Sequence, residues 1–545
     1  MAAFTVYEQL LLELMNRARL DPVGEAARLG ISLNAGLAPG TISTATKQAL
    51  APNNELVTAA RAHSQHMINV DLFDHENIGD GTPTSRMTAA GYALTGSWMT
   101  GENIAWTGTT GVADVLAFTI EIADNLFLSA GHRVNTLNES FREAGTGIVA
   151  GAFTDTGTTY NAVMATENFG LSGSSVFVSG VAINDADGDN FYDVGEARAN
   201  VNVAVSTNAI ADGNDVTEAA GGYSVATATG THVVTFSGGG LASPVTVAVA
   251  GGGSNVKVDL SGTNEILSSV TTILGSGAKD LVLLGAVVAN GTGNALANVM
   301  IGSKGNNILD GGTGNDTLTG GAGNDTYYLD SALDVVNEAV GTGTQDTIVS
   351  SVAVRLDTTT TAQGVEHVSL LGSNGVSVVG TSTFNAITGN SGANYLAGYG
   401  GNDTVSGGGS ADRILGGDGK DTLTGGAGDD SFLYAFIADS GGTQARRDVI
   451  TDFSQIAGNN DWIDLALTDA NGALGGNQTF AFISTAAFSG AAGELRYFQD
   501  VANNRTIIEG NVRIDAASAG AEFSIELTGL KTLTGGGNNS FDIIL

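Results

Sequence analysis

Two hydrophobic patterns alternate along the first 170 residues of the chain. Apolar residues recur with helical spacing in Leu10–Ala18, Leu56–Met67 and Val112–Ile122. Gly145–Phe153 and Tyr160–Phe169 instead alternate or run apolar in the manner of β-strands. Four of the six His, six of the seven Met and four of the five Pro also precede residue 170, so the composition changes there. The pattern predicts a mixed α/β domain over residues 1–172.

Short Val, Thr and Ala segments separated by glycines follow this domain. Val201–Val205 and Thr231–Phe236 are two of these segments, and they predict a small β-sandwich over residues 173–260. Apolar strand patterns return in the last hundred residues, where we expect a β domain over residues 436–545. With 545 residues the chain is too long for one ordinary core, so a multidomain protein is expected.

A nine-residue period of the form G-G-x-G-x-D-x-U-x, where U is a large apolar residue, occupies the middle of the chain. Three consecutive repeats, the first of which starts at Gly302, belong to a block that we place at residues 261–330. Five consecutive repeats, the first of which starts at Gly389, belong to a second block at residues 380–435. The period is lost over residues 331–379, which we expect to be an irregular roll or linker segment. Val365–Leu371 within it has the pattern of a roll strand without a metal-binding turn.

The repeat has the chemistry of a calcium site. Glycines permit turns with positive φ that bring backbone carbonyls inward, and the sixth-position carboxylate supplies a hard anionic oxygen. The predicted calcium ligands are Asp316, Asp325, Asp403, Asp412, Asp421 and Asp430. Asn307 and Asn394 take the same position without charge, so we expect weaker outer turns there.

Both blocks resemble the RTX, or hemolysin-type calcium-binding, repeat family. The resemblance implies a parallel β-roll whose eighth-position residues, such as Leu423 and Phe432, fill an apolar interior. A glycine-rich disordered linker is the alternative. It is disfavoured because disorder gives no reason to keep an apolar residue in register.

A second calcium candidate lies in the predicted sandwich. Oxygen-bearing side chains fall at positions one, three, five, nine and twelve of a twelve-residue loop, as in an EF-hand, and belong to Asp185, Asp187, Asp189, Asp193 and Glu196. Asn190 stands where the EF-hand pattern has glycine, and the flanks have strand patterns. The loop is similar to the DxDGD loops of bacterial surface adhesins. A plain acidic turn is the alternative.

Charge and cysteine content narrow the function classes. A formal net charge of −35 disfavours nucleic acid and anionic membranes and favours multivalent cations. The chain has no Cys, which excludes disulfides, thiolate nucleophiles and Cys-based zinc sites. We expect neither a cleavable N-terminal signal nor a membrane span.

Phrases of the N-terminal domain resemble the CAP superfamily, also called the SCP-like fold. They include Asn16–Arg19, Phe73–His75, Gly101–Trp106, Ser129–Asn135 and Gly145–Ile148. The resemblance implies an α-β-α sandwich with a cleft lined by two His and two Glu. By motif these are His75, Glu102, Glu121 and His132.

Several roles for this tetrad stay open. Two imidazoles and two carboxylates could act in catalysis, His75 and His132 could hold Zn²⁺, or the four could only hydrogen-bond the cleft together. His63 and His66 on the preceding helix are predicted to be packing or surface residues. The chain contains no H-E-x-x-H metalloprotease motif.

The C-terminal segment resembles the C-terminal domain of serralysin-type secreted proteases. Arg447–Ser454, Asp461–Leu465 and the final Phe541–Leu545 carry the resemblance. It implies an uncleaved signal read by a type I secretion apparatus, and an extracellular or cell-surface location. A strongly acidic chain should resist compaction where calcium is scarce and fold outside the cell on binding it.

The fold expected is therefore multidomain, with a CAP domain, a small β-sandwich, a parallel β-roll and a C-terminal β domain. Three functions remain open for it. The CAP domain could bind a lipid or other small ligand as an effector, it could be a metal-assisted hydrolase, or the rolls could self-associate through Ca²⁺ into an extracellular matrix or surface layer.

Overall fold

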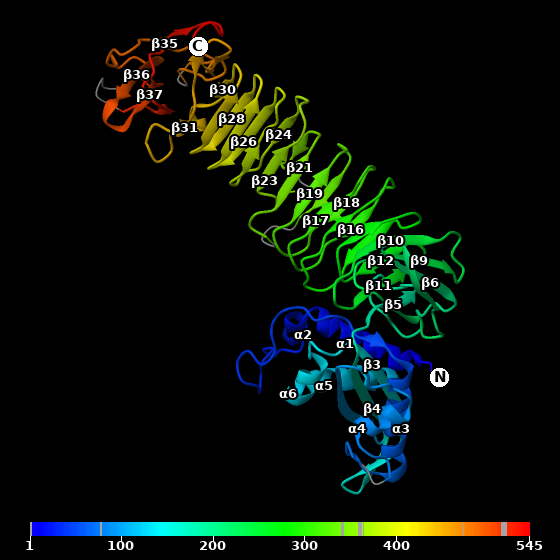
Figure 1. The fold of residues 1–545 in the computed structure, drawn as a ribbon. Helices are drawn as coiled ribbons and strands as arrows, with labels where there is room; N and C mark the ends of the chain where they lie inside the picture. Colours follow the sequence, from blue (N-terminus) through cyan, green and yellow to red (C-terminus); the bar gives the residue numbers. More distant parts are fainter. Residues whose placement is uncertain are drawn as a thin grey trace. The chain divides into compact units, whose positions relative to one another are not determined.

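The chain is represented by a computed structural model that describes residues 3–76, 79–338, 343–357, 362, 364–471, 474–513 and 520–545. It contains two compact units, Met1–Asn307 and Ile308–Leu545. Figure 1 traces both along the sequence.

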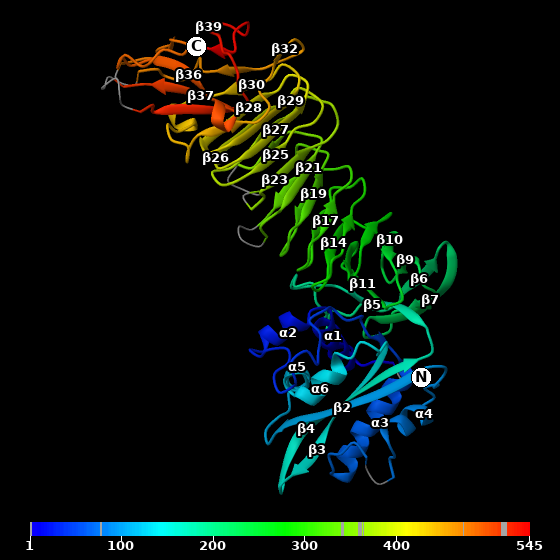
Figure 2. The same cartoon turned by 60° about the vertical axis from the view of Figure 1, so that its left-hand side comes forward.

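A three-layer α/β/α arrangement forms the first part of unit 1. Its helices are α1 (Val6–Leu20), α2 (Pro22–Arg28), α3 (Asn54–Val70), α4 (Pro83–Ala89), α5 (Val115–Leu128) and α6 (Ala130–Thr136), and its strands are β1 (Ala51–Pro52), β2 (Trp98–Thr109), β3 (Glu143–Asp155) and β4 (Thr158–Ser172). The sheet order is β1-β3-β4-β2. α3 and α4 lie on one face of the sheet and α1, α5 and α6 on the other (Figure 2).

Strand β4 is apolar on both faces because both are covered. Val163 packs with Leu11 of α1, while its neighbour Met164 packs with Met67 of α3. Successive side chains of a strand point to opposite faces, so an uninterrupted apolar run is what a doubly covered strand requires.

Close packing places α3 directly on β3. A side chain at Gly145 would come within 2.1 Å of the backbone nitrogen of Val57, and one at Gly147 within 2.3 Å of the carbonyl carbon of Ala60. The two glycines therefore set the distance between helix and sheet, and they hold the His63 face of α3 over the strands.

Two of the helices predicted from spacing lie within α1 and α3, and the two predicted strands lie within β3 and β4. The third, Val112–Ile122, overlaps α5 but starts three residues before that helix begins at Val115. Strand β2 was not predicted, because Gly101, Glu102 and Asn103 interrupt its apolar pattern. Glu102 and Asn103 are nevertheless buried, so polar groups inside this strand mark a site and not a loop.

Two sheets follow in unit 1. Their strands are β5 (Val176–Ile183), β6 (Val201–Thr207), β7 (Ile210–Val216), β8 (Gly222–Thr227), β9 (Thr231–Gly238), β10 (Val245–Ala250), β11 (Val256–Ser261), β12 (Glu265–Ser268), β13 (Thr272–Leu274), β14 (Asp280–Leu283), β15 (Gly291–Thr292) and β16 (Val299–Ile301). The orders are β8-β5-β11-β12-β14-β16 and β7-β6-β9-β10-β13-β15. Tyr223 of the first sheet packs edge-on against Phe236 of the second, with ring centroids 5.9 Å apart.

Unit 2 is built from short strands that alternate between two sheets. The strands are β17 (Ile308–Asp310), β18 (Thr317–Thr319), β19 (Thr326–Leu329), β20 (Val335–Asn337), β21 (Thr347–Ser350), β22 (Val354–Arg355), β23 (His367–Leu370), β24 (Ser377–Val379), β25 (Ala386–Thr388), β26 (Tyr395–Gly401), β27 (Thr404–Gly409), β28 (Arg413–Gly419), β29 (Thr422–Ala427) and β30 (Ser431–Leu433). From β19 onward the odd-numbered strands of this set pair in parallel, and so do the even-numbered strands from β22.

This is the predicted parallel β-roll. Ile387, Val405 and Leu423 are in register on one sheet, and Leu396, Ile414 and Phe432 on the other. The eighth-position side chains Leu318, Tyr327, Val405, Ile414, Leu423 and Phe432 are all fully buried.

The segment at residues 331–379 continues the roll although its nine-residue period is lost. β20 to β24 lie in it, and β21 and β23 join the same sheet as β19 and β25. β23 (His367–Leu370) is the roll strand predicted within Val365–Leu371.

The chain ends in a further β region. Its strands are β31 (Asp448–Ile450), β32 (Gln455–Ile456), β33 (Asn459–Asn460), β34 (Trp462–Asp464), β35 (Ala481–Phe482), β36 (Glu494–Asp500), β37 (Arg505–Asn511), β38 (Phe523–Thr528), β39 (Gly535–Gly536) and β40 (Ile543–Ile544). β31 and β34 extend the two sheets of the roll, while β36, β37 and β38 are antiparallel. In the described part of the chain, no helix has the length and apolarity that a bilayer crossing requires.

Candidate functional site

The sixth-position aspartates of the second block form a ladder of carboxylates, called here the carboxylate ladder. On one sheet, Oδ1 of Asp421 accepts a hydrogen bond from the backbone N–H of Asp403 at 2.7 Å, 18 residues earlier. On the other sheet, Asp430 accepts in the same way from Asp412 at 2.8 Å. One oxygen of each carboxylate therefore accepts a hydrogen bond from the preceding turn of the same sheet.

The second oxygen of each carboxylate in this block makes no such hydrogen bond. The Oδ2 atoms of Asp403, Asp412, Asp421 and Asp430 are buried and lack a hydrogen-bond partner among the described residues. Burial, opposed by the backbone hydrogen bond and increased by neighbouring carboxylates, raises the pKa values of Asp403, Asp412 and Asp421 to about 7. A buried carboxylate oxygen without a partner is costly unless a cation or a proton neutralises it.

The first glycine of each repeat lies so close to these oxygens that a side chain would not fit there. A side chain at Gly398 would come within 2.2 Å of Asp403 Oδ2, and one at Gly416 within 2.2 Å of Asp421 Oδ2. The repeat thus leaves room beside hard anionic oxygens, which are the ligands that Ca²⁺ prefers. Asp316 and Asp325 of the first block are buried at the equivalent position. Hard, buried oxygens suit calcium, and its binding by the six predicted aspartates stays a prediction.

The two asparagines at this position close their own turns. Asn394 Oδ1 accepts from the backbone N–H of Asn390 at 2.9 Å, and Asn307 Oδ1 accepts from the N–H of Ser303 at 2.7 Å. A neutral amide held within its turn is a poor calcium ligand, and weaker binding at these two turns stays a prediction.

Sequence reasoning missed the continuation of the ladder beyond the second block. Asp448 accepts from the N–H of Asp421 at 2.8 Å and Asp461 from that of Asp430 at 3.1 Å. These partners are 27 and 31 residues apart instead of 18, so a search for a fixed period does not find them.

The loop after β5 gathers part of its predicted ligand set. Ligand atoms of Asp185, Asp187 and Asp189 all lie within 4.8 Å of one another. Glu196 is buried and accepts from the backbone N–H of Ala186 at 2.7 Å, which ties the twelfth position back to the second. Burial and the neighbouring carboxylates raise the pKa of Asp193.

Asn190 in this loop adopts φ of 60°, in the left-handed region where the EF-hand pattern has glycine. Asparagine tolerates that region better than most residues, so the departure from the pattern preserves the turn. The loop follows a strand instead of a helix, as its flanks predicted.

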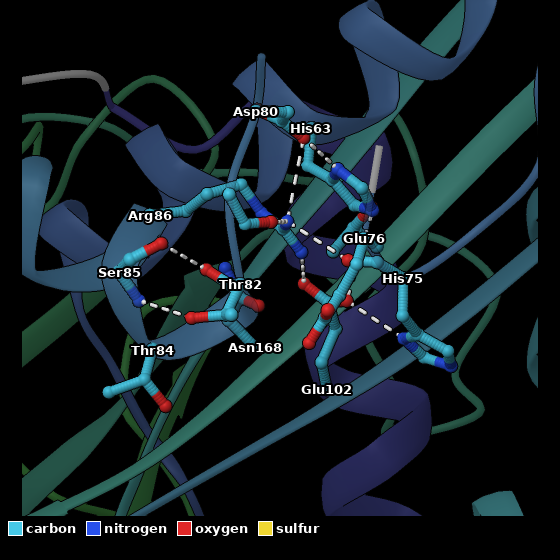
Figure 3. Close-up of polar contacts among 12 residues, drawn as sticks. His63, His75, Glu76, Asp80, Thr82, Thr84, Ser85, Arg86, Glu102 and Asn168 are labelled. Atoms are coloured by element: carbon cyan, nitrogen blue, oxygen red, sulfur yellow. Dashed lines mark hydrogen bonds and ion pairs between the residues drawn. The ribbon is translucent and has the colours of Figure 1, made fainter. Parts of the chain in front are cut away.

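In the α/β/α domain, Glu102 is the centre of a polar cluster (Figure 3). Its Oε1 lies 2.9 Å from Nδ1 of His75, and its Oε2 accepts from Nη2 of Arg86 at 2.5 Å. Arg86 also donates to the backbone oxygen of His75 at 3.0 Å. The hydrogen bond to Glu102, opposed by partial burial, raises the pKa of His75.

Sequence reasoning missed three members of this cluster. His63 of α3 is fully buried, its Nδ1 contacts Asp80, and its Nε2 lies 3.8 Å from Glu102 Oε1. Burial lowers the pKa of His63. The prediction of a packing or surface residue is thus incomplete, because His63 is buried but polar. Asp80 and Arg86 follow no motif that could have indicated them.

The structure places His132 near this cluster but leaves Glu121 apart. His132 on α6 is half-buried, and burial together with the charge of His75 lowers its pKa. Glu121 is exposed on α5, and among the described residues it has no hydrogen bond or ion pair with the other three. His66 is half-buried on α3.

Glu102 offers zinc no free oxygen in this arrangement, and a zinc site at His75 and His132 stays a prediction. Both oxygens of Glu102 are engaged, one by His75 and the other by the guanidinium of Arg86. Within the described ranges, the groups of three or more ligating side chains are Asp185, Asp187 and Asp189, and Asp325, Glu338 and Asp346. Neither group contains His75 or His132.

Three family models match separate parts of the chain. Residues 12–165 match the cysteine-rich secretory protein (CAP) family, residues 292–328 match the RTX calcium-binding nonapeptide repeat, and residues 390–536 match the C-terminal domain of the serralysin peptidases. These matches confirm the three resemblances found in the sequence. No curated protein matches the chain significantly.

Solved structures give partial matches. An extracellular SCP-domain protein from Bacillus anthracis is 25% identical over 23% of this chain, with a TM-score of 0.18, and the match spans about a third (34%) of that protein. The AlgE6R3 and AlgE6R2 subunits of the Azotobacter vinelandii mannuronan C5-epimerase are 28% and 21% identical. They cover 29% and 37% of this chain and 72% and 92% of their own, with TM-scores of 0.14 and 0.17.

Proposed function

Because this chain joins a CAP domain to RTX calcium-binding repeats and a serralysin-type C-terminal domain, we propose that it is a secreted protein that folds on binding calcium and presents its CAP domain as a ligand-binding module. The calcium part of the proposal rests on the buried, unpartnered Oδ2 atoms of the carboxylate ladder. The repeats then serve folding and stability, and the CAP domain meets the ligand.

Calcium would supply the positive charge that the buried Oδ2 atoms of the carboxylate ladder need. Stacked buried carboxylates repel one another. A divalent cation bound between two turns of the roll attracts the carboxylates on both sides and so replaces this repulsion. Extracellular modules bind calcium at about 10⁻⁴ to 10⁻³ M, so the sites fill outside the cell. The energy of metal binding becomes folding energy only there, and the chain stays unfolded before export.

The C-terminal region suits export by a type I secretion apparatus. Asp542 is buried, and it accepts from the backbone N–H of Thr534 at 2.7 Å. Ile543 beside it is fully buried in β40. A signal in this segment would be accessible only before folding, which agrees with export of an unfolded chain.

The CAP cluster is better suited to binding than to hydrolysis. Both oxygens of Glu102 are already engaged, one with His75 and the other with Arg86, so neither is free to take a proton from a substrate or a water. Val70, Leu72 and Phe73, which precede His75 in the sequence, are 45%, 48% and 38% exposed. Exposed apolar residues beside a half-exposed imidazole suit a lipid or another apolar small ligand. No contact among the described residues favours the hydrolase or the calcium-assembled matrix.

Circular dichroism of the full chain tests the calcium part of the proposal. With excess chelator we expect largely disordered repeats, and we expect cooperative gain of β structure as calcium is added. Light scattering during the same titration separates compaction of a monomer from assembly. Full β content in chelator would contradict the proposal.

Displacement of a fluorescent fatty acid from the calcium-loaded chain tests the CAP part. We expect Phe73→Ser to weaken binding, while Val112→Ser, which changes an exposed apolar residue on another loop, leaves it unchanged. Equal binding by both variants, or turnover of ester and peptide substrates by the wild-type chain, would argue against a binding module.

A further inference from the structure

Three buried acidic residues meet in the irregular part of the roll. Asp325, Glu338 and Asp346 have ligand atoms that all lie within 4.8 Å of one another. Asp325 and Asp346 are fully buried, and Glu338 is 8% exposed. Glu338 and Asp346 lie outside the stretches that match the RTX repeat and serralysin families.

The roll itself brings the two aspartates together. β19 and β21 pair in parallel with Thr326 opposite Thr347, so the preceding residues, Asp325 and Asp346, stack on the same edge. Oδ1 of Asp346 accepts from the backbone N–H of Asp325 at 2.7 Å. This is the contact of the carboxylate ladder, but it joins residues 21 apart instead of 18.

Glu338 lies in the segment between the two aspartates, which is three residues longer than in the regular repeats. It directly follows β20, and its Oε2 accepts a hydrogen bond from the hydroxyl of Tyr327. Tyr327 occupies the eighth position of its repeat, where the other repeats have apolar residues. Its hydroxyl thus fixes the orientation of a carboxylate that no regular repeat provides.

The second oxygen of Asp346 points to a missing partner. Asp346 Oδ2 is buried and has no hydrogen-bond partner among the described residues. A side chain at Gly343 would come within 2.4 Å of this oxygen and within 2.2 Å of the backbone oxygen of Gly323. The absence of a side chain at Gly343 leaves room beside a carboxylate oxygen and a carbonyl oxygen, both of which are hard ligands.

We propose that Asp325, Glu338 and Asp346 bind one calcium ion between the two repeat blocks. Three fixed carboxylates suit calcium better than magnesium, which demands near-ideal octahedral geometry and keeps several waters. The inference rests on the proposed calcium-dependent folding and adds a site in which Glu338 and Asp346, outside the two nonapeptide blocks, join Asp325 of the first block. This ion would hold the irregular turn in register, so that the roll is continuous from β19 to β25.

Counting bound calcium tests this site. The full chain and its Asp346→Asn and Glu338→Gln variants would be saturated with calcium, desalted and measured by native mass spectrometry. Both substitutions preserve size and a hydrogen-bond acceptor. We expect each variant to bind one calcium ion fewer than the wild-type chain. Asp155→Asn, which removes an exposed carboxylate at the end of β3, should bind the wild-type number.

Terbium luminescence gives a second readout, because a tyrosine beside a bound Tb³⁺ sensitises its emission. With Tb³⁺ as the probe, Tyr327→Phe should remove part of the emission, and Tyr328→Phe, at the exposed neighbouring position, should not. Equal emission from both variants would contradict the site.

The outcomes separate this inference from the proposed function. If the wild-type chain binds calcium but Asp346→Asn or Glu338→Gln binds the same number, the additional site is wrong and the repeat sites stand. The additional site is also wrong if Asp346→Asn is more heat-stable at unchanged stoichiometry, because the acids would then share protons instead of a metal. If the wild-type chain binds none, the proposed function fails.

Discussion

Asp412 donates its backbone N–H to the side chain of Asp430, 18 residues further along the chain and one turn of the roll away, at 2.8 Å. Asp403 and Asp421 repeat the relationship on the opposite sheet. The residue that would bind calcium in one turn therefore also fixes the backbone of the turn before it, which couples metal binding to the stacking of the roll.

Removing two ligands of the carboxylate ladder should weaken calcium-dependent folding. For Asp421→Ala with Asp430→Ala we expect the calcium midpoint of folding to rise by at least about tenfold, because each charged contact is worth roughly 1.5–3 kcal/mol. Circular dichroism at increasing calcium concentration measures this midpoint. His132→Ala in the CAP domain should leave it unchanged. An equal shift in both variants would mean that the two regions do not have separate roles.

Acidification should act differently with and without calcium. Burial raises the pKa values of Asp403, Asp412 and Asp421 to about 7, above the ordinary value of 3.8. Without calcium these groups favour folding below about pH 4, and this contribution is lost as the pH rises towards 7. In chelator, β content should therefore be higher at pH 5 than at pH 8.

In the presence of calcium the same groups should give the opposite trend. Protons and calcium compete for the same oxygens, so the calcium midpoint should rise as the pH falls from 8 to 6. Calcium titrations at several pH values measure this shift. A midpoint that does not depend on pH would show that these carboxylates are not the ligands.

The space beside the carboxylates should not tolerate a methyl group. Gly416→Ala would place a carbon 2.2 Å from Asp421 Oδ2, so the carboxylate must move and the calcium midpoint should rise. Gly252→Ala is the matched control, because a side chain there meets no atom within 4 Å. The two variants are compared in the same calcium titration. Indistinguishable midpoints would mean that the position of Asp421 does not matter for binding.

Arg86 should be important for the stability of the CAP domain. Arg86→Ala leaves the buried Glu102 carboxylate without its guanidinium, and breaking a buried pair of this kind costs roughly 3–5 kcal/mol. Asp124→Ala, which removes the more exposed ion pair that this residue makes with Arg28, should cost about 1 kcal/mol or less. Urea unfolding at saturating calcium, followed by the helical signal, measures both. Similar losses would show that the Glu102 cluster is not a buried structural pair.

The repeats could be predicted from the sequence because their information is local. Nine residues contain the glycines, the aspartate and the buried apolar residue, and Leu423 and Phe432 occupy the interior as expected. The contacts of Asp346, Asp448 and Asp461 could not be predicted in this way. They obey the same geometry, but their spacings depend on excursions of the chain that tertiary packing accommodates.

The CAP cluster was predicted in part for a related reason. His75 and Glu102 lie in phrases that carry the resemblance to the CAP family, and the structure joins them at 2.9 Å. Asp80 and Arg86 come from a loop and a short helix without a repeating pattern, and only the folded chain brings them to Glu102. His63 has helical spacing, which predicts burial but does not indicate a polar partner.

The hydrogen bonds accepted by Asp448 and Asp461 show that the carboxylate ladder runs in one direction along the chain. Each turn has its amide groups satisfied by the turn that follows it, and the final pair comes from the C-terminal β region. A chain cut near residue 435 would leave the amides of Asp421 and Asp430 without acceptors, so the open end would fray. We therefore expect ordering to spread from the C-terminal end towards the first repeat, with the last part of the chain serving as the template on which the earlier turns assemble.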